Sequence, residues 1–455
     1  MIPLVRLRSL VHPAHKRPMR LRFCQFCFLI LWLAGTIARA QDRFILTPTT
    51  PTALPTLAST YSLTVVQSVD NNGRTYVVTG PGNVAPKDLE KEVEGDSQVS
   101  NFELDQSTGL PEVTQSTAAI LDTLPTPTSV NYFGTNVLAF YTTQPAVTLT
   151  RLPNVQAKGV TGTGVVVAVI DTGVDPTHPV LQGQLLPGYD FVHNLDGTAS
   201  EWIDLTPANA AALAQSSTSP ATKNTVAMVS QSTAAILDQS TAAILDYNNL
   251  PHAFGHGTMV AGVVHLAAPT AQILPLKAFS GDGTANLSDI LRAVYYAVDN
   301  GAQVINMSFT LTAPSAELAA AMQYAGKKGV LCIAAAGNTG LANVGNPANL
   351  PYVMGVASTS DTDTRSTFSS YGRGVFLAAP GEGVVTTYPG SNYAEATGTS
   401  FSSPLVAGAG ALVKQLAPHL GDDVGEVMGR AKHLTVKGIG HGRLDALQVV
   451  QAAKD

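Results

Sequence analysis

The sequence predicts an α/β fold in which helices flank a mostly parallel sheet, preceded by a small α+β module. Apolar residues make up 45% of the 455 residues and charged residues 13%, which is typical of a well-packed chain. Continuous apolar runs such as VVVAVI (165–170) and GVLCIAAAG (329–337) indicate strands that are buried on both faces. Helical stretches such as NLSDILRAVYYAVDNG separate these runs, and that succession implies right-handed crossovers and parallel pairing.

The first 40 residues are predicted to be a secretory signal peptide. Arg20 and Arg22 precede the apolar run FCQFCFLILWLAG, and Ala38 and Ala40 provide small residues at a cleavage point. The apolar run is too short for a membrane-spanning helix. We therefore expect a secreted or periplasmic protein with no stable membrane span once the signal is removed.

Charge and cysteine content change when this segment is set aside. It holds seven of the 26 basic residues and none of the 32 acidic ones, so the remaining chain has a formal charge of −13. An acidic exported protein is a poor candidate for nucleic-acid binding. Cys332 is the one cysteine after residue 40, which excludes an intramolecular disulfide, and its apolar neighbours predict a core residue rather than a reactive thiol.

A small module is predicted ahead of the main domain. Residues 41–56 are rich in Pro and Thr and are predicted to be a linker. Residues 57–106 are predicted to form a ββαβ module. Two alternating strands surround the turn signal Asn71-Asn72-Gly73, Pro86 opens a short charged helix, and VSNFELD follows as a strand.

The rest of the chain divides into a linker and connecting segment (107–154) and the α/β domain (155–455), with an insertion at about 196–250. The phrase QSTAAILD occurs at 115–122 and, in tandem within the insertion, at 231–238 and 239–246. Its polar and apolar halves make a short amphipathic helix plausible. The insertion is predicted either to be a duplicated surface segment without chemistry or to cover a nearby cleft.

Four short motifs place polar residues at the ends of predicted strands or the starts of predicted helices. They are VIDTGVD with Asp171, GHGTMVAG with His256, AAAGNTG with Asn338, and GTSFSSP with Ser400. Taken singly, each residue has a structural explanation as a turn, capping, loop or helix-start residue. Sites in open α/β sheets lie at the carboxyl ends of strands, which favours a shared site.

Together the four residues match the requirements of nucleophilic catalysis. A serine hydroxyl needs a base that accepts its proton, and the base needs an acid that fixes its tautomer. Asp171, His256 and Ser400 could supply acid, base and nucleophile. The Asn338 side chain and the backbone N–H of Ser400 could hold an oxyanion.

These motifs, in the chain order Asp, His, Asn, Ser, resemble the subtilisin-like serine proteases (subtilases) over residues 155–450. The resemblance implies a subtilisin-like three-layer fold and a serine endopeptidase with Asp171, His256 and Ser400 as triad and Asn338 as oxyanion residue. It also implies polypeptide substrates bound as an extended strand, a monomer, and an N-terminal module that acts as propeptide and inhibitor. The substrate-lining positions that match the family pattern are Ser308, Phe309, Thr310, Ala335, Ala336 and Gly337.

Three departures from the family pattern have consequences. Thr310 stands where the family usually has Gly, which would narrow the rim of the pocket for the residue before the scissile bond. Met259 replaces a second His without an expected effect on the chemistry. The connection after His256 lacks the Asn-rich loop that holds calcium in many relatives, so no metal site and no cofactor are predicted.

Other functions are less well supported. GVTGTGVV has glycines, but they precede a strand, whereas a dinucleotide-binding fingerprint follows one. An α/β-hydrolase would have Ser400 within G-x-S-x-G, and the sequence is G-T-S-F-S. The remaining alternative is a catalytically silent, secreted subtilase-fold binding protein.

Overall fold

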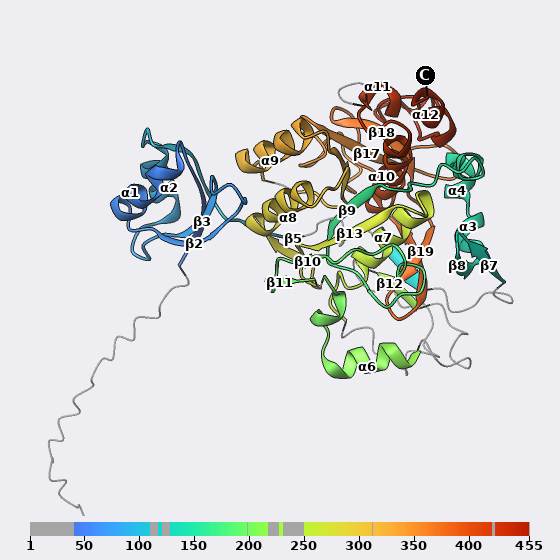
Figure 1. The fold of residues 1–455 in the computed structure, drawn as a ribbon, viewed down its shortest axis with the longest axis horizontal. Helices are drawn as coiled ribbons and strands as arrows, with labels where there is room; N and C mark the ends of the chain where they lie inside the picture. The colour runs from blue at the N-terminus through green and yellow to red at the C-terminus, as the bar shows by residue number, and fades with distance from the viewer. Residues whose placement is uncertain are drawn as a thin grey trace, which may run out of the picture. The chain divides into compact units, whose positions relative to one another are not determined.

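A computed structural model describes residues 41–109, 117–120, 128–197, 199–216, 227–230, 250–311, 313–420 and 424–454 (Figure 1). The predicted signal peptide and the tandem QSTAAILD copies lie outside these residues. Within the described part of the chain, no helix combines the length and apolar character needed to cross a bilayer.

An eight-stranded sheet forms the centre of the main domain, in the order β11-β10-β13-β9-β15-β16-β17-β18. Every neighbouring pair is parallel except β10 and β11. This confirms the predicted mostly parallel sheet. The strands are β9 (Val166–Asp171), β10 (Tyr189–Asp190), β11 (Leu195–Asp196), β13 (Gln272–Lys277), β15 (Val304–Met307), β16 (Leu331–Ala335), β17 (Val353–Thr359) and β18 (Val375–Pro380).

Helices cover both faces of this sheet, which gives three layers (Figure 1). Val167 and Val169 of β9 belong to a core cluster with helices α7 and α10, whereas Ala168 and Ile170 belong to a cluster with α8 and α9. Side chains alternate between faces along a strand, so β9 is apolar throughout because both faces are buried. The helices are α7 (His256–Ala267), α8 (Leu287–Asp299), α9 (Ala316–Lys327), α10 (Thr399–Leu416), α11 (Val424–Met428) and α12 (Ala446–Ala452).

The small residues predicted for α7 and α10 allow these helices to pack closely. A Cβ atom added at Gly408 of α10 would lie 2.3 Å from the Cβ of Ala267, at the end of α7. Both helices begin at the carboxyl edge of the sheet, with His256 and Thr399 as their first residues. Their close contact therefore fixes the positions of two of the predicted site motifs.

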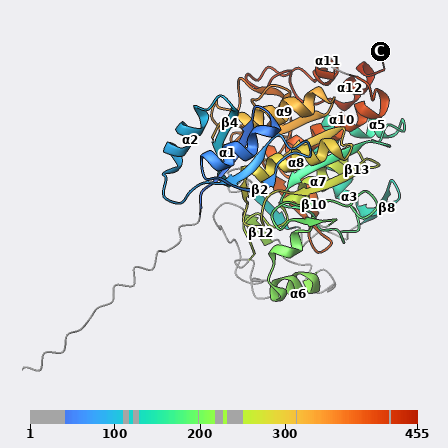
Figure 2. The same ribbon diagram turned by 60° about the vertical axis from the view of Figure 1, so that its left-hand side comes forward.

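The N-terminal module is a β-α-β-β-α-β unit with an antiparallel sheet in the order β2-β3-β1-β4. Helices α1 and α2 cover one face of the sheet and form a small core with Phe44 and Leu46 (Figure 2). Ile45, on the other face, belongs to the cluster of α8 and α9. The elements are β1 (Arg43–Pro48), η1 (Pro51–Ala53), α1 (Leu54–Thr60), β2 (Thr64–Ser68), β3 (Tyr76–Thr79), α2 (Pro86–Glu94) and β4 (Val99–Leu104).

The prediction of a linker over residues 41–56 is wrong. RFILTP forms β1, which lies between β3 and β4 in the middle of the sheet. Pro51 is the first residue of η1 and Pro55 the second residue of α1, and at both positions a missing backbone N–H costs nothing because a helix start offers it no partner. The module therefore begins with a strand that precedes the predicted ββαβ elements.

The described part of the predicted linker 107–154 is structured as well. Its later elements contribute Val137, Tyr141, Leu152 and Val155 to the core beside α7 and α10. This contribution to the core was not predicted, because the helices are short and interrupted by proline, so their apolar residues show no extended periodicity in the sequence. The elements are β5 (Ser107–Gly109), β6 (Thr117–Ile120), β7 (Ser129–Tyr132), β8 (Thr135–Leu138), α3 (Ala139–Thr143), α4 (Pro145–Thr150) and α5 (Leu152–Gln156).

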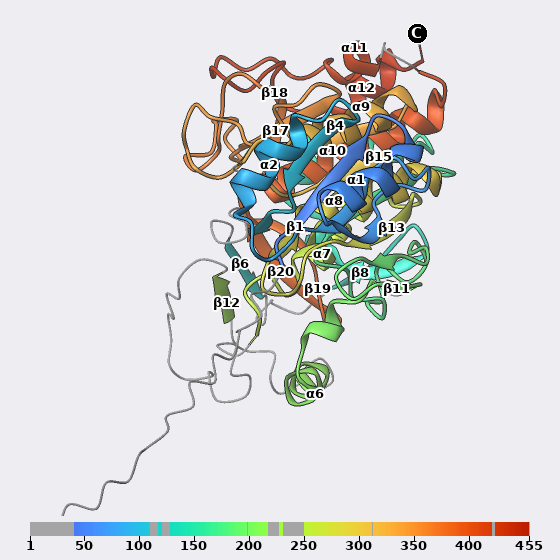
Figure 3. The ribbon, with the colours of Figure 1, turned by 90° about the vertical axis from the view of Figure 1, so that its left-hand side faces the viewer.

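The first QSTAAILD copy contributes a strand and not the helix considered from its sequence. Its residues Thr117–Ile120 form β6, which lies between β20 (Asn392–Thr397) and β12 (Ala227–Ser230) in a second sheet completed by β19 (Val384–Tyr388). Figure 3 shows β6 and β12 beside β20 and β19. Pairing with a neighbouring strand decides the conformation of so short a segment, because four residues cannot make a stable helix alone.

Candidate active site

Asp171 is the last residue of β9, in the centre of the parallel sheet. Its side chain is 2% exposed. Its Oδ1 atom accepts a hydrogen bond of 2.7 Å from the backbone N–H of Thr172. The residue that follows β9 therefore helps to hold the carboxylate in place without a contact from another element.

His256 begins α7 and contacts Asp171 directly. The preceding Gly255 has φ 90°, a left-handed conformation that turns the chain into the helix and favours glycine. The distance between His256 Nδ1 and Asp171 Oδ1 is 2.7 Å, and both side chains are buried. His256 Nε2 has no hydrogen-bond partner among the described residues. The ring also packs against Phe401, with 5.8 Å between ring centroids, so it lies beside the start of α10.

Ser400 lies in the first turn of α10, directly after β20. The turn between strand and helix passes through Gly398, whose φ of 152° and ψ of 159° are accessible almost only to glycine. The Ser400 Oγ atom donates to the backbone carbonyl of Ser308 at 3.2 Å. The structure thus brings Ser400 to the same edge as Asp171 and His256 but shows no hydrogen bond from its Oγ to His256.

A chain of buried side chains connects the start of α10 with the end of β15. Ser308 Oγ donates to the carbonyl of Ser400 at 2.8 Å, and Asn306 Nδ2 donates to Ser308 Oγ at 2.9 Å. Ser403 Oγ donates to Asn306 Oδ1 at 2.8 Å. Since each group is satisfied by the next, the network holds the Ser400 backbone rigidly against the sheet.

Asn338 follows β16 and is oriented by Thr399. Its Oδ1 atom accepts hydrogen bonds from the backbone N–H of Thr399 at 2.9 Å and from the hydroxyl of Thr399 at 2.8 Å. This fixes the orientation of the side-chain amide and turns its NH₂ group away from Thr399. The first N–H groups of a helix also lack intrahelical partners, so the backbone at Ser400 supplies a second type of donor.

The predicted substrate-lining residues lie on two segments that extend from adjacent parallel strands. Ser308, Phe309 and Thr310 follow β15, and Ala335, Ala336 and Gly337 end or follow β16. The Phe309 side chain packs in the core against Phe279, with ring centroids 4.9 Å apart, so only its backbone can line a site.

Three charged side chains next to the site were not predicted from the sequence, namely Glu201, Asp204 and Lys277, and each is buried or half-buried. Glu201 of η2 (Glu201–Asp204) is fully buried beside Thr172, and burial raises the pKa of its carboxyl to about 7. Lys277, the last residue of β13, is also buried and contacts Asp204 Oδ2 at 2.5 Å. Glu201 and Asp204 lie at the start of the long Ala/Ser/Thr-rich insertion, which was predicted to be a surface segment without chemistry or a cover over a nearby cleft, whereas Lys277 ends a strand of the central sheet.

The structure also bears on the predictions for Cys332 and for a metal site. Cys332 is buried in β16, and burial raises the pKa of its thiol to about 12, as suits a core residue. Among the described residues, no group of three or more His, Cys, Asp or Glu side chains could hold a metal ion. Independence from a cofactor stays a prediction.

Comparisons with known proteins point to one family. A model of the subtilase family matches residues 162–442, and subtilisin BL from Lederbergia lenta is 34% identical over 277 residues, covering 59% of this chain and 82% of that protein. The chain belongs to the subtilase family. Thermitase from Thermoactinomyces vulgaris is 33% identical over 265 residues, covering 56% of this subtilase and 76% of that protein. Alkaline elastase YaB from Bacillus sp. (strain YaB) is 40% identical over 179 residues, with coverage of 37% and 47%.

Membership confirms the predicted resemblance and the three-layer fold, and it places this subtilase among the serine endopeptidases. The matched span begins at residue 162, so the N-terminal module lies outside it.

Proposed function

We propose that this subtilase is a secreted endopeptidase that cleaves peptide bonds with Asp171, His256 and Ser400 as its triad. The hydrogen bond between His256 Nδ1 and Asp171 Oδ1 is the observation that carries the proposal. When Nδ1 donates its proton to the carboxylate, a neutral imidazole has its lone pair on Nε2. Nε2 is therefore the atom available to accept the proton of Ser400.

Acylation follows from these positions. His256 Nε2 takes the hydroxyl proton while Ser400 Oγ bonds to the carbonyl carbon of the substrate, and the Asn338 NH₂ group and the Ser400 backbone N–H stabilise the oxyanion. The C–N bond then breaks, and His256 gives its proton to the leaving amine. Water adds to the acyl-enzyme with His256 as base, and the Ser400–carbon bond breaks as Ser400 regains its proton.

The substrate is proposed to bind as an extended strand. Strand β14 (Thr284–Asn286) precedes α8, and it already pairs with a strand of this chain, β5, in an antiparallel register with Thr108 opposite Ala285. A peptide substrate can form the same main-chain bonds, because β-augmentation depends on the backbone and not on particular side chains. Polypeptides are therefore the proposed substrate class.

The N-terminal module is proposed to act as an inhibitor of its own enzyme until it is cut. The strand that follows the module, β5, occupies β14, and the side chain of Asp105, just before β5, accepts bonds from Ser288 N at 2.9 Å and Ser288 Oγ at 2.8 Å. While these contacts persist, a substrate cannot pair with β14. The secreted enzyme is further proposed to be a monomer without a cofactor.

The test compares residues 41–455 with the Ser400→Ala variant of the same chain. Both are treated with a serine-reactive phosphonate, and intact masses and N-terminal sequences are determined. We expect one adduct on the wild type, none on the variant, and a shortened N-terminus on the wild type only. A folded wild type without an adduct would overturn the proposal in favour of a catalytically silent binding protein.

A further inference from the structure

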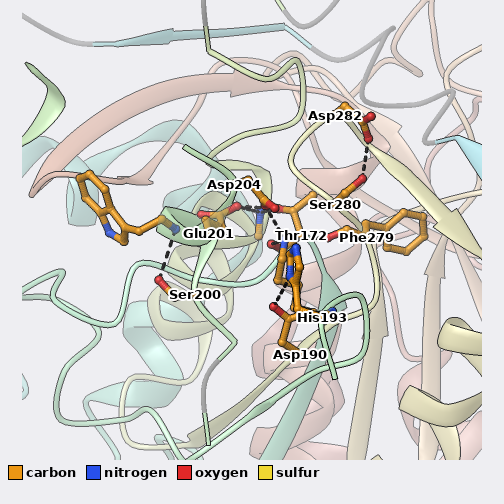
Figure 4. Close-up of polar contacts among 12 residues, drawn as sticks. Thr172, Asp190, His193, Ser200, Glu201, Asp204, Phe279, Ser280 and Asp282 are labelled. Carbon is orange, nitrogen blue, oxygen red and sulfur yellow. Dashed lines mark hydrogen bonds and ion pairs between the residues drawn. The ribbon is translucent and has the colours of Figure 1, made fainter. Parts of the chain in front are cut away.

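The short helix η2 lies next to the proposed catalytic pair. It contacts three segments there, which are the chain after β9, the start of α7 and the end of β13. Figure 4 shows Thr172, Glu201 and Asp204 gathered in one cluster. The segment before η2 is held to the chain after β9, because Glu201 N donates to Val174 O at 3.1 Å and Val174 N donates to Ala199 O at 2.8 Å. The first turn of the insertion is thus attached to the strand that carries Asp171.

The carboxylate of Glu201 accepts four hydrogen bonds inside the protein. Oε1 accepts from Thr172 Oγ1 at 2.5 Å and from the backbone N–H groups of Gly255 and Gly257, each at 3.1 Å. Oε2 accepts from Thr258 Oγ1. Gly255 and Gly257 are the two neighbours of His256, and Thr172 is the neighbour of Asp171. One buried carboxylate therefore holds the backbone on both sides of the proposed base and the side chain of the residue next to its acid partner.

Two further contacts anchor η2, both made by residues that follow Glu201 in the helix. Trp202 Nε1 donates to Asp175 Oδ1 at 2.9 Å. Asp204 Oδ2 contacts Lys277 Nζ at 2.5 Å, and the same Nζ donates to the carbonyl of Thr172 at 2.8 Å. These anchors restrain the Glu201 carboxylate, since each fixes an adjacent part of the helix to the sheet edge.

We infer that Glu201 is a positioning residue of this enzyme: its carboxylate fixes Thr172 and the first turn of α7, and so holds the His256 ring against Asp171. The inference rests on the proposed function of Asp171, His256 and Ser400. Glu201 itself contacts neither the proposed nucleophile nor the oxyanion donors, so it acts through the groups it holds.

The Thr172 hydroxyl makes this role dependent on the charge of Glu201. It has one proton, and it lies 2.5 Å from Glu201 Oε1 but 3.2 Å from Asp171 Oδ1, while it accepts from Gly257 N at 2.9 Å. An ionised Glu201 attracts that proton most strongly. A protonated Glu201 competes for it less, so the hydroxyl can turn to Asp171 Oδ1, the atom that already binds His256.

The electrostatic surroundings place the charge change near neutral pH. Burial raises the pKa of Glu201 to about 7, and the negative charge of Asp171 acts in the same direction. The hydroxyls of Thr172 and Thr258 and the charge of Lys277 act to lower it. The ionised form needed for positioning is therefore gained as pH rises through neutrality.

The experiment uses the 41–455 chain with Glu201→Gln, Glu201→Ala and the control Glu426→Gln. Glutamine has nearly the shape of glutamate but no charge, whereas alanine removes all four bonds. Glu426 forms an exposed ion pair with Arg430, so its variant reports the loss of a surface carboxylate. Phosphonate labelling rate, kcat, KM and the pH profile of kcat/KM are measured for each, with the unfolding midpoint as a check of folding.

We expect Glu201→Ala to lower kcat by roughly 10- to 100-fold with little change in KM, since small misplacements of catalytic groups have effects of this size. Glu201→Gln should fold and move the acid limb of kcat/KM to lower pH by roughly half to one unit, because a nearby negative charge and its titration are both removed. Glu426→Gln should match the wild type.

The outcomes separate the positioning role from the proposed function. A Glu201→Gln variant with wild-type kcat and an unmoved acid limb would overturn the role of Glu201, even if its unfolding midpoint fell. A wild type that is not labelled at all would instead contradict the triad itself. If Glu201→Ala does not fold, the pH profile of Glu201→Gln decides.

Discussion

The side chain of Thr310 lies directly against the backbone of Gly345: a Cβ atom added to this glycine would lie 2.8 Å from the Cβ and 2.9 Å from the Cγ2 of Thr310. The two segments are also joined by backbone bonds, with Leu311 N donating to Asn346 O at 2.6 Å and Asn346 N donating to Leu311 O at 3.3 Å. Gly345 N approaches Ala336 O at 3.4 Å. Thr310, on one predicted substrate-lining segment, therefore packs on Gly345, whose backbone N–H approaches the other segment at Ala336.

Replacing Thr310 with Gly should widen the range of accepted substrates. The change removes the side chain that packs on Gly345, so a larger residue can enter before the scissile bond. We expect the ratio of kcat/KM for phenylalanine over alanine peptide anilides to rise by about tenfold or more, as for a few methylenes of pocket space. Thr310→Ser, which keeps the Cβ and hydroxyl, should change the ratio less. An unchanged ratio in Thr310→Gly would show that Thr310 does not limit the pocket.

Replacing Asn338 with Ala should slow the chemical step. The variant removes the amide whose orientation Thr399 fixes, and loss of one oxyanion donor costs roughly 10²- to 10³-fold in kcat. KM should change little, because the donor acts mainly on the transition state. The exposed Asn154→Ala serves as control. Steady-state kinetics on one peptide substrate give the answer, and near-normal turnover would remove Asn338 from the mechanism.

Replacing Asp105 with Ala should weaken the proposed inhibition by the module. The change leaves Arg43 Nη2, 3.0 Å from Asp105 Oδ2, without its carboxylate partner and Ser288 N–H without its acceptor. Asn71→Ala is the matched control, since Asn71 Nδ2 bonds Asp299 Oδ2 at an exposed position.

The processed enzyme, with its cut module still bound, is diluted so that the module dissociates. The measured quantity is the enzyme concentration at which half of the activity has been released. Asp105→Ala should raise it by roughly tenfold or more, corresponding to a lost buried hydrogen-bonded charge, and Asn71→Ala by about twofold or less. Equal effects of the two variants would argue against Asp105 as the main anchor.

Module release should become easier as pH rises. Glu103 of β4 accepts from Ser315 Oγ at 2.8 Å and from Glu317 N at 3.2 Å, and Thr47 donates to Glu317 Oε1 at 2.7 Å. Burial raises the pKa of both carboxyls, and the charge of Glu317 raises that of Glu103 further. Asp70 adds a second negative charge near Glu317.

The sign follows from proton linkage. With raised pKa values in the docked state and ordinary ones after separation, docking takes up protons and is favoured below the ordinary value near 4.5. It weakens as pH rises through the raised values. The dilution midpoint should therefore be higher at pH 7 than at pH 5, and Glu317→Gln should reduce the difference. A lower midpoint at pH 7 would contradict the assignment.

The local sequence pattern was sufficient to predict the strands of the central sheet and the places of the four motif residues along the chain. These features depend on residues that are neighbours in the chain. They are the continuous apolar runs, the helices between them, and the positions of Asp171, His256, Asn338 and Ser400 at strand ends or helix starts. The hairpin at Asn71-Asn72-Gly73 is of the same kind, because Gly73 adopts φ 61°, as its turn requires. Periodicity and glycine placement record such features directly.

Tertiary structure decided the features whose partners are distant in sequence. Composition suggested a linker for residues 43–48, but pairing with β3 and β4 makes them a central strand. Glu201 is 56 residues from Gly257, and its segment carries no pattern that distinguishes a buried carboxylate from a surface one. Thr310 was noticed from the sequence as a departure, yet its contact with Gly345 needed the fold. Local sequence determined which elements form and which residues end them, whereas long-range packing and hydrogen bonding determined which of those residues meet, because such contacts have no fixed spacing along the chain.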